Sequence, residues 1–285
     1  MTTQLSVYAD PQAEAAGAVS AVVASLPLSF APAGPAAPAA SAPAASVPAA
    51  SAPDITAVSG HAGWTERAAA AVRKGAKGIV VSGPVAEDPA ALIGVAEAAG
   101  SVVVLDQPWA GNLALAGSRE NVHGVIAAAL EDAVLLDSVA IGVPGTDPRD
   151  LLTEQFSVLV QCGIAVQNVR MVQRNANGYT VAGVLASGAP VALQGILTSA
   201  LPATASVSIL TSTGRADVVL PDPAAAWPAL VRAVTKEGAT ALPTLYESSH
   251  RTSWSRVHSH LSSGIPATDL AQFSTVLSLV SQLTS

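Results

Sequence analysis

The side chains best suited to chemistry gather between Tyr246 and His260, where three of the five histidines fall within eleven residues. Aromatic faces and the donor fork of arginine suit polyols and carboxylates. One interpretation is a sugar or polyol cleft, and its predicted lining residues are Tyr246, His250, Arg251 and Trp254. A metal site built from Glu247, His250 and His258 is an alternative, but no metal-ligand spacing such as HExxH supports it. A solvated segment between domains is the third interpretation.

A second candidate group follows the β-branched run 55–58. His61 and Trp64 lie in the turn Ser-Gly-His-Ala-Gly-Trp, at the carboxyl end of a predicted parallel strand, where ligands bind in open α/β sheets. We predict both as ligand-binding residues, with the alternative that His61 is a turn residue that caps the next helix. Cys162 lies on the apolar face of a predicted helix and is interpreted as a core residue.

The elements that must position these residues begin with a βαβαβ rhythm between Asp54 and Trp109. Three short runs are apolar on both faces, as buried parallel strands are; they span 55–58, 78–81 and 102–105. Ala-rich runs over 64–74 and 88–99 predict the helices that connect them. This stretch therefore predicts a parallel sheet covered by helices.

The chain before that stretch predicts another β-α unit, with a strand over 5–8, a helix over about 12–24 and a second strand near 26–30. The strand-to-helix junction reads Tyr-Ala-Asp-Pro-Gln-Ala-Glu-Ala-Ala-Gly. It lacks the GxGxxG glycines that let backbone N–H groups approach a pyrophosphate. Residues 31–53 are a run of Pro, Ala and Ser without charge. Such a run buries too little apolar surface to fold, so we predict a disordered linker there.

After the central stretch the pattern changes. Helices are predicted over 118–129 and 151–162, on either side of a strand over 135–143. Further short runs with alternation or β-branched content predict an antiparallel sheet of about five strands; they span 166–173, 178–185, 190–199, 206–211 and 216–220. A helix is predicted over 227–237, and an amphipathic helix over 268–283.

These elements together predict two domains of different fold class. Residues 1–143 form a truncated Rossmann-like domain of the α/β class, with a parallel sheet. Residues 144–285 form an open antiparallel sheet domain of the α+β class, with helices on one face and a C-terminal amphipathic helix.

Composition excludes several classes of function. The 285-residue chain has a formal net charge of −7 and no block of Lys or Arg, which argues against nucleic acid or anionic lipid as a partner. Its single cysteine excludes an internal disulfide and a Cys-based zinc site. The most apolar segment, 122–143, contains Glu131, Asp132 and Asp137, so no membrane span is predicted. The N-terminus has no signal-peptide pattern, and we expect a cytoplasmic protein.

Several motifs occur in an order that resembles one superfamily. They are Ala68–Val81, Ser82-Gly83-Pro84, Pro84–Ala90, Trp109–Asn112, Gly178–Thr180 and Ser187–Pro190. Over about Asp54 to Leu261 the chain resembles the glucose–fructose oxidoreductase/inositol dehydrogenase/MocA (Gfo/Idh/MocA) superfamily. The resemblance implies a Rossmann domain joined to an open antiparallel sheet domain, and hydride transfer with NAD(P).

Three functional motifs of that family are altered in this chain. Where the family has Glu-Lys-Pro the chain has Ser82-Gly83-Pro84, so Gly83 stands at the position of the catalytic lysine. The family motif Asp-x-x-x-His aligns with Asp150 to Glu154, so a glutamate replaces the general acid/base histidine. A carboxylate could accept a proton there if burial raised its pKa. The glycine-rich pyrophosphate loop is absent.

Two hypotheses follow. The first is a degenerate, non-catalytic relative that binds no cofactor and no metal, and assembles through its open sheet with itself or with a related active subunit. The alternative is an NAD(P)-dependent oxidoreductase or sugar-modifying enzyme with an altered site, in which Glu154, Asp150 and His250 are catalytic. The residues predicted to contact a small polar ligand are His61, Trp64, Trp109, Tyr246, Arg251 and Trp254.

Overall fold

The computed structural model describes residues 4–32, 52–116, 120–225 and 227–283. The chain divides into two compact units, which are described separately. The first unit comprises residues 1–105 and 254–267, and the second comprises residues 106–253 and 268–285. Most of the predicted linker, residues 33–51, lies outside the described residues.

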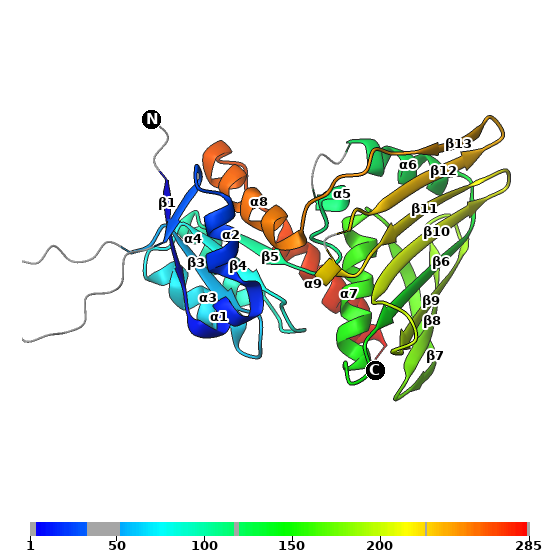
Figure 1. Cartoon of the computed structure of the whole chain (residues 1–285). Coiled ribbons are helices and arrows are strands. Elements are labelled where there is room, and N and C mark those ends of the chain that lie inside the picture. Colours follow the sequence, from blue (N-terminus) through cyan, green and yellow to red (C-terminus); the bar gives the residue numbers. More distant parts are fainter. Residues whose placement is uncertain (1–3, 33–51, 117–119, 226, 284–285) are drawn as a thin grey trace, which may run out of the picture. The chain divides into compact units, whose positions relative to one another are not determined.

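The first unit is built on a five-stranded sheet with the order β2-β1-β3-β4-β5 (Figure 1). Its strands are β1 (Leu5–Ala9), β2 (Phe30–Pro32), β3 (Ile55–Ser59), β4 (Gly78–Ser82) and β5 (Val102–Asp106). Strands β2, β1, β3 and β4 pair in parallel. Every residue of β4 and β5 is buried, which explains their uninterrupted apolar sequence and confirms the predicted parallel sheet.

Helices of the first unit pack on this sheet. They are α1 (Pro11–Gly17), α2 (Val19–Ser25), α3 (Trp64–Arg73), α4 (Ala90–Ala99) and the larger part of α8 (Ser249–Ser263). The single helix predicted over 12–24 is divided in two, because Ala18 takes a left-handed φ of 45° that ends α1 and begins α2. Trp254 of α8 packs edge-to-face on Phe30, with ring centroids 5.4 Å apart, in the same apolar core.

The second unit is built on an eight-stranded sheet with the order β13-β12-β11-β10-β6-β9-β8-β7 (Figure 1). Its strands are β6 (Ala133–Gly142), β7 (Val166–Asn175), β8 (Gly178–Leu185), β9 (Pro190–Leu197), β10 (Thr204–Thr211), β11 (Arg215–Leu220), β12 (Leu230–Thr235) and β13 (Gly238–Ala241). Neighbouring strands are antiparallel except β6 and β9, which run parallel. The predicted antiparallel sheet is confirmed and is wider than predicted.

Strand β6 lies in the middle of this second sheet, whereas the predicted domain boundary near Val143 assigns it to the first domain. Buried and partly exposed residues alternate along β6 from Leu135 to Gly142. This is the pattern of a strand with one face on the core, and it differs from the strands of the parallel sheet, which are buried on both faces. The two compact units accordingly divide between Leu105 and Asp106.

The helix predicted over 227–237 is wrong, because this segment forms β12 and the turn that leads into β13. The β-branched residues Val231, Val234 and Thr235 favour a strand. Gly238 begins β13 with a φ of 136°, a conformation that glycine adopts without strain and that lets the chain reverse.

Four described helices lie wholly within the second unit, which also contains residues 249–253 of α8. They are α5 (Leu113–Ala116), α6 (Glu120–Glu131), α7 (Pro148–Gln161) and α9 (Asp269–Gln282), and a 3-10 turn spans Pro223–Ala225. Helix α7 carries the fully buried Phe156 and Leu159 and packs against α9, so both predicted helices are confirmed. None of the described helices is long and apolar enough to cross a membrane.

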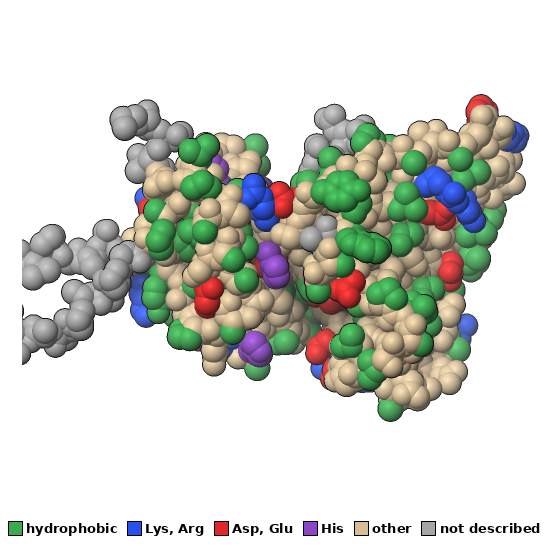
Figure 2. All heavy atoms as spheres, viewed as in Figure 1, with side chains coloured by type: hydrophobic (Ala, Val, Ile, Leu, Met, Phe, Trp, Pro, Cys, Tyr) green, Lys and Arg blue, Asp and Glu red, His purple; other side chains and the backbone are tan. Residues whose placement is uncertain are grey.

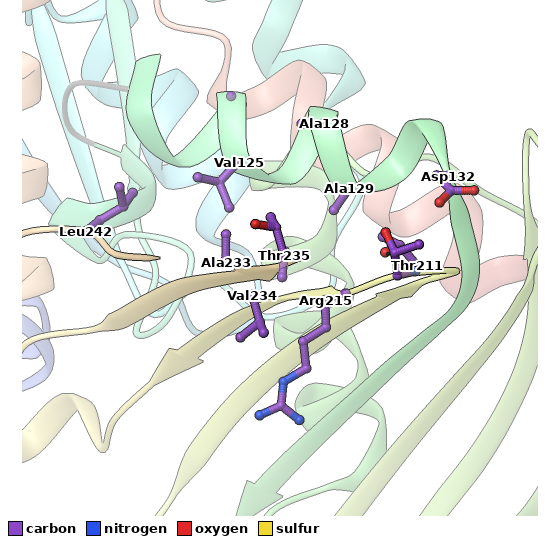
Figure 3. Close-up of a pocket in the computed structure, with 14 residues that line it drawn as sticks. Val125, Ala128, Ala129, Asp132, Thr211, Arg215, Ala233, Val234, Thr235 and Leu242 are labelled. Atoms are coloured by element: carbon purple, nitrogen blue, oxygen red, sulfur yellow. Dashed lines mark hydrogen bonds between the residues drawn. The ribbon is translucent and has the colours of Figure 1, made fainter. Parts of the chain in front are cut away.

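Small side chains on α6 leave a groove between this helix and strands β10 to β12 (Figure 3). The groove has a volume of about 600 Å³. Val125 and Leu242 lie toward one end of it, and Asp132 lies at the other (Figure 3). Asp106, Glu154 and His250, which form the candidate site described below, do not line this groove.

Candidate functional site

The candidate site is organised around Asp106, the last residue of β5 and the first residue of the second unit. Its side chain is completely buried. The Asp106 Oδ2 lies 2.5 Å from Nδ1 of His250, which is in the first turn of α8 and whose side chain is 42% exposed. Asp106 Oδ1 is enclosed and has no hydrogen-bond partner in the described part of the chain. The site therefore joins a buried carboxylate to an imidazole that water can reach.

The charge of Asp106 controls the protonation of His250. The hydrogen bond to Asp106 raises the pKa of His250 above its ordinary value, and the negative charge of the carboxylate adds to this effect. Burial of the ring acts in the opposite direction but is the smaller effect. The imidazole is thus held toward its protonated form, with Nδ1 donating to Asp106.

Glu154 is the second buried acid of this unit. It lies in the middle of α7, and its Oε2 is enclosed without a hydrogen-bond partner among the residues that the structure describes. Burial raises the pKa of Glu154 to about 8, and the negative charges of Asp150 and Asp106 add to the effect. Glu154 is therefore a neutral acid at pH 7, although the residue as a whole keeps some solvent exposure.

The start of α7 sets the positions of both predicted acids. Asp147 caps the helix by accepting the Arg149 N–H at 2.8 Å, and Pro148 occupies the first turn. Asp150 and Glu154 then lie one turn apart on the same side of the helix. Burial raises the pKa of Asp150, and the charge of Asp147 contributes to the increase.

This arrangement supplies groups that general acid–base chemistry requires. Glu154 holds a proton at neutral pH, whereas Asp106 pairs with a protonated imidazole. A buried carboxyl group with a strongly raised pKa, as Glu154 has, is typical of general acids in enzymes. Asp106 is not among the residues predicted from the sequence, and its only signal there is a carboxylate at the end of the apolar run Val-Val-Val-Leu.

The residues of the predicted polyol cleft are divided by the structure. Tyr246, His250 and Arg251 lie in the second unit, where Tyr246 is 77% exposed and Arg251 pairs with Glu247 at 2.8 Å. Trp254 belongs to the core of the first unit and is fully buried. Tyr246, His250 and Arg251 are accessible and stay predicted ligand contacts.

The other two predicted tryptophans are also buried. The indole N–H of Trp109 donates to the Pro221 carbonyl at 3.2 Å, and that of Trp64 donates to the Val85 carbonyl at 3.0 Å. Each ring is enclosed in its own unit. Packing accounts for Trp64, Trp109 and Trp254 because none presents an open aromatic face, which a sugar contact needs.

His61 lies in the first unit, after β3 at the carboxyl end of the parallel sheet. Its Nδ1 contacts the Ser59 hydroxyl, and its ring is exposed. Arg67 fixes the turn by donating to the carbonyls of Ser59, His61 and Ala62 at 2.7 to 2.9 Å. Strands β1 and β3 are parallel neighbours. The next strand after β1, β2, lies on one side of this pair, and the next strand after β3, β4, lies on the other side. Ligands of open α/β sheets bind at the point where the strand order reverses in this way.

The segment Ser82-Gly83-Pro84 follows β4 at the same sheet edge. Ser82 is buried, and its hydroxyl oxygen has no partner among the described residues. Gly83 has a left-handed φ of +60°, and a Cβ added there would meet no atom within 4 Å. This turn therefore contains open space where the family resemblance implies a lysine.

A groove of about 890 Å³ lies beside β1, β2, α1 and α2 of the first unit. Its apolar lining includes Val7, Ala9, Val19, Val23, Phe30 and Pro32. Glu14 supplies a carboxylate, and no Lys or Arg is among the lining residues that the structure describes. The described residues also contain no group of three or more His, Cys, Asp or Glu side chains that could hold a metal ion.

Charged side chains are sparse on the face that Figure 2 shows. The described Lys and Arg side chains stand there in small separate groups. The chain as a whole carries 13 basic and 20 acidic residues. The surface in view therefore offers no broad basic patch for a polyanion.

No protein-family profile matches the sequence, and no curated protein matches it. Solved structures do match. KijD10, a 3-ketoreductase from Actinomadura kijaniata in complex with NADP and TDP-benzene, gives a TM-score of 0.63 at 14% identity and covers 99% of this chain and 89% of its own. The UDP-N-acetylglucosamine 3-dehydrogenase GnnA from Acidithiobacillus ferrooxidans gives a TM-score of 0.58 at 14% identity, and the match covers 81% of this chain and 78% of GnnA. A dehydrogenase from Chromobacterium violaceum gives a TM-score of 0.59 at 16% identity, and the match covers 81% of this chain and 76% of the dehydrogenase.

The chain has the fold of these oxidoreductases. The two-sheet architecture predicted from the sequence is confirmed, and the likeness supports the superfamily resemblance at the level of fold. The prediction that the protein uses no cofactor is contradicted, because the KijD10 structures of this fold hold NADP. The absence of GxGxxG concerns one loop, whereas the likeness to these structures covers most of the chain.

Proposed function

We propose that the chain is a nicotinamide-dependent oxidoreductase that interconverts a hydroxyl and a carbonyl group on a polyol or sugar-like substrate. One observation carries the proposal: the buried Asp106 is bonded to His250 in the same unit that holds Glu154 as a neutral acid. The fold shared with NADP-bound ketoreductase structures supports it.

The cofactor would accept or supply the hydride, and residues of this chain would manage the proton. In reduction, the protonated Glu154 carboxyl donates a proton to the carbonyl oxygen of the substrate. In oxidation, the carboxylate takes the proton of the hydroxyl. Asp106 keeps His250 protonated and oriented, so that its free ring N–H can donate to a substrate oxygen. Proton transfer by a positioned side chain contributes roughly 10²- to 10⁴-fold to a rate.

The groove beside β1 and β2 fits the nucleoside part of a dinucleotide. Its volume is in the range of small-molecule sites, and its lining is mostly apolar, as an adenine ring requires. The first turn of α1 is not a pyrophosphate seat of the glycine-rich type. Pro11 has no N–H to offer, and the carboxylate of Asp10 already accepts the Ala13 N–H at 2.7 Å. Val7, Ala9 and Phe30 would therefore hold the nucleoside.

Glu14 determines which dinucleotide this groove favours. Its carboxylate lines the groove together with Ser20, to which it is hydrogen-bonded at 2.9 Å. A carboxylate at such a site suits the free ribose hydroxyls of NAD, whereas a 2′-phosphate needs an arginine or another cation. We infer a preference for NADH over NADPH, in contrast to the NADP bound by KijD10.

Titration of NADH and NADPH into the purified chain, followed by nicotinamide fluorescence and by calorimetry, tests the proposal. We expect saturable binding of NADH, competition by AMP and weak competition by nicotinamide mononucleotide, because the described groove fits the adenosine half. Millimolar NADH and NADPH without effect would overturn the proposal.

A binding or assembly subunit without hydride transfer is the second candidate function. Gly83 favours it, because no side chain at this strand end can replace the lysine that the family resemblance implies. This candidate predicts that NADH binds, if at all, without any substrate being oxidised or reduced. Light scattering of the purified chain at micromolar concentration tests the assembly part, and a monodisperse monomer would count against it.

A further inference from the structure

Helix α7 is tied on two sides by hydrogen bonds between a glutamine and a serine. On one side, Gln107 Nε2 donates to Ser157 Oγ at 2.8 Å. On the other, Gln155 Nε2 donates to Ser138 Oγ at 2.9 Å. The second bond joins α7 to β6, and the first joins it to the turn that follows β5. The two bonds have the same chemistry, but they bring α7 against different parts of the second unit.

Only the first bond connects the segments that carry the buried acids. Gln107 directly follows Asp106, and Ser157 lies three residues after Glu154 on α7. The Ser157 hydroxyl in turn donates to the Thr153 carbonyl at 2.9 Å, which fixes its direction on the helix. A movement of Gln107 away from Ser157 therefore moves the Asp106 backbone relative to the turn of α7 that holds Glu154.

The turn after Asp106 also touches the residue that precedes His250. A Cβ on Gly111 would lie 2.4 Å from the Gln107 carbonyl oxygen and 3.4 Å from the Ser249 Cβ. The turn is closed tightly enough that only glycine fits, and it packs against the first turn of α8. One short turn thus contacts α7 through Gln107 and α8 through Gly111.

We propose that Gln107 and Ser157 are positioning residues, which hold the Asp106 carboxylate in place against His250. The catalytic meaning of this assignment rests on the proposed function, but the positioning itself is a property of the second unit. Neither residue needs to touch substrate. Their effect passes through Asp106, whose buried carboxylate has His250 as its one hydrogen-bonded side-chain partner among the described residues.

Other charged groups lie on or beside the helices that carry this site and are unchanged by the proposed substitutions. On α7 they are Asp147, Arg149 and Asp150, and around the start of α8 they are Glu247 and Arg251. A change in the titration of His250 on mutation of Ser157 therefore reports a displacement of Asp106.

The test compares Ser157→Ala with Ser138→Ala by NMR titration of His250 in the otherwise intact chain, without cofactor or substrate. Each substitution removes a serine hydroxyl that accepts from a glutamine amide, so a lower urea midpoint is expected for both. We expect Ser157→Ala to lower the pKa of His250 by roughly half a unit or more, on the scale of shifts that single partners produce. Ser138→Ala should leave that pKa unchanged, and Ser157→Thr, which keeps the hydroxyl, should restore it.

Equal shifts of the His250 pKa in the two variants, or no shift in Ser157→Ala, would overturn the proposal. If Ser157→Ala does not fold, Gln107→Ala gives the same comparison from the less buried partner. Because the titration needs neither NADH nor turnover, its failure is separate from a failure of the proposed function. If the protein is active, Ser157→Ala should also move the acid limb of the pH–rate profile, whereas Ser138→Ala should not.

Discussion

The end of strand β4 and the group of Asp106, Glu154 and His250 were both candidates for a functional site, but their side chains differ in chemistry. At the carboxyl edge of the parallel sheet, β4 ends at Ser82 and Gly83 follows it, and neither residue has an acidic or basic side chain. In the second unit, Glu154 and His250 have raised pKa values, and the buried Asp106 carboxylate is hydrogen-bonded to His250. One strand end without acid or base side chains is therefore compatible with such groups elsewhere in the same fold.

The difference teaches how to weigh a missing motif. The family resemblance implies a lysine where the chain has Gly83, and this difference can be read directly from the sequence. The pair of the buried Asp106 carboxylate and His250 joins residues that are 144 positions apart, so no local sequence pattern reveals it. The absence of familiar residues in the first unit is thus weak support for a protein without activity.

Removal of the Asp106 charge should have the largest effect. Asp106→Asn keeps the shape of the side chain, but it can no longer stabilise a protonated imidazole. We expect turnover of any accepted substrate to fall by roughly 10²-fold or more, and the pKa of His250 to fall toward about 6.5. Asp217→Asn is the matched control, because Asp217 is ion-paired with Arg215 at 3.0 Å on β11 and lies in the same unit. Unchanged turnover in Asp106→Asn would show that the second unit does not carry the chemistry.

The pH dependence of stability should report the buried acid. Glu154 has a pKa of about 8 in the folded chain against 4.5 ordinarily. Between these values the folded chain holds a proton that the unfolded chain has released, so the free energy of unfolding falls as pH rises from 4.5 toward 8. The raised pKa of His250 acts in the same direction above its ordinary value. Urea unfolding at a series of pH values should show this slope, and Glu154→Gln should flatten it; an equal slope in both proteins would contradict the burial of the acid.

Introducing a lysine at Gly83 in the first unit should lower the stability of the protein. Gly83→Lys meets no atom at its Cβ, but it forces a side-chain residue into a left-handed φ, at about 1–2 kcal/mol. Gly94→Lys is the control, because Gly94 lies inside α4, also with open space, and lysine favours a helix over glycine. Urea unfolding of the two variants should therefore move in opposite directions. A Gly83→Lys protein as stable as the parent would show that the conformation of this turn does not require glycine.

The smallest expected effect concerns the choice of dinucleotide. Glu14→Gln removes the one carboxylate among the described groove residues while leaving a side chain of the same size. We expect the preference for NADH over NADPH to narrow by a factor of about 10, which is about 1.4 kcal/mol. Calorimetric titration with both dinucleotides measures it. An unchanged ratio would show that this groove does not hold the ribose.

The parallel sheet was predictable because its strands are apolar on both faces. Strand β6 was assigned to the wrong neighbours, since a single strand does not reveal its sheet. The β12–β13 hairpin was missed because alanine and apolar residues over 227–237 also suit a helix. Pairings between distant strands decide both cases, and they become visible only in the folded chain.

The family resemblance selects Asp150 and Glu154, and the cluster of histidines selects His250. All three lie in one unit, and their catalytic roles stay predictions. Asp106 was missed because a carboxylate that ends an apolar strand resembles an ordinary strand terminus. Trp64, Trp109 and Trp254 were predicted to contact a ligand but are buried, because the sequence does not distinguish a buried indole from an exposed one. Trp227 was not selected, yet it is 69% exposed.

Hydride transfer itself is the most direct test of the account. The purified chain is incubated with NAD⁺ and a panel of polyols and sugars, and with NADH and the corresponding keto compounds, while the absorbance of reduced nicotinamide is followed. The account predicts a change with at least one substrate pair, lost in Glu154→Gln and in Asp106→Asn and retained in Asp217→Asn. A nicotinamide signal that stays flat although NADH binds, or an activity that survives both substitutions, would contradict it.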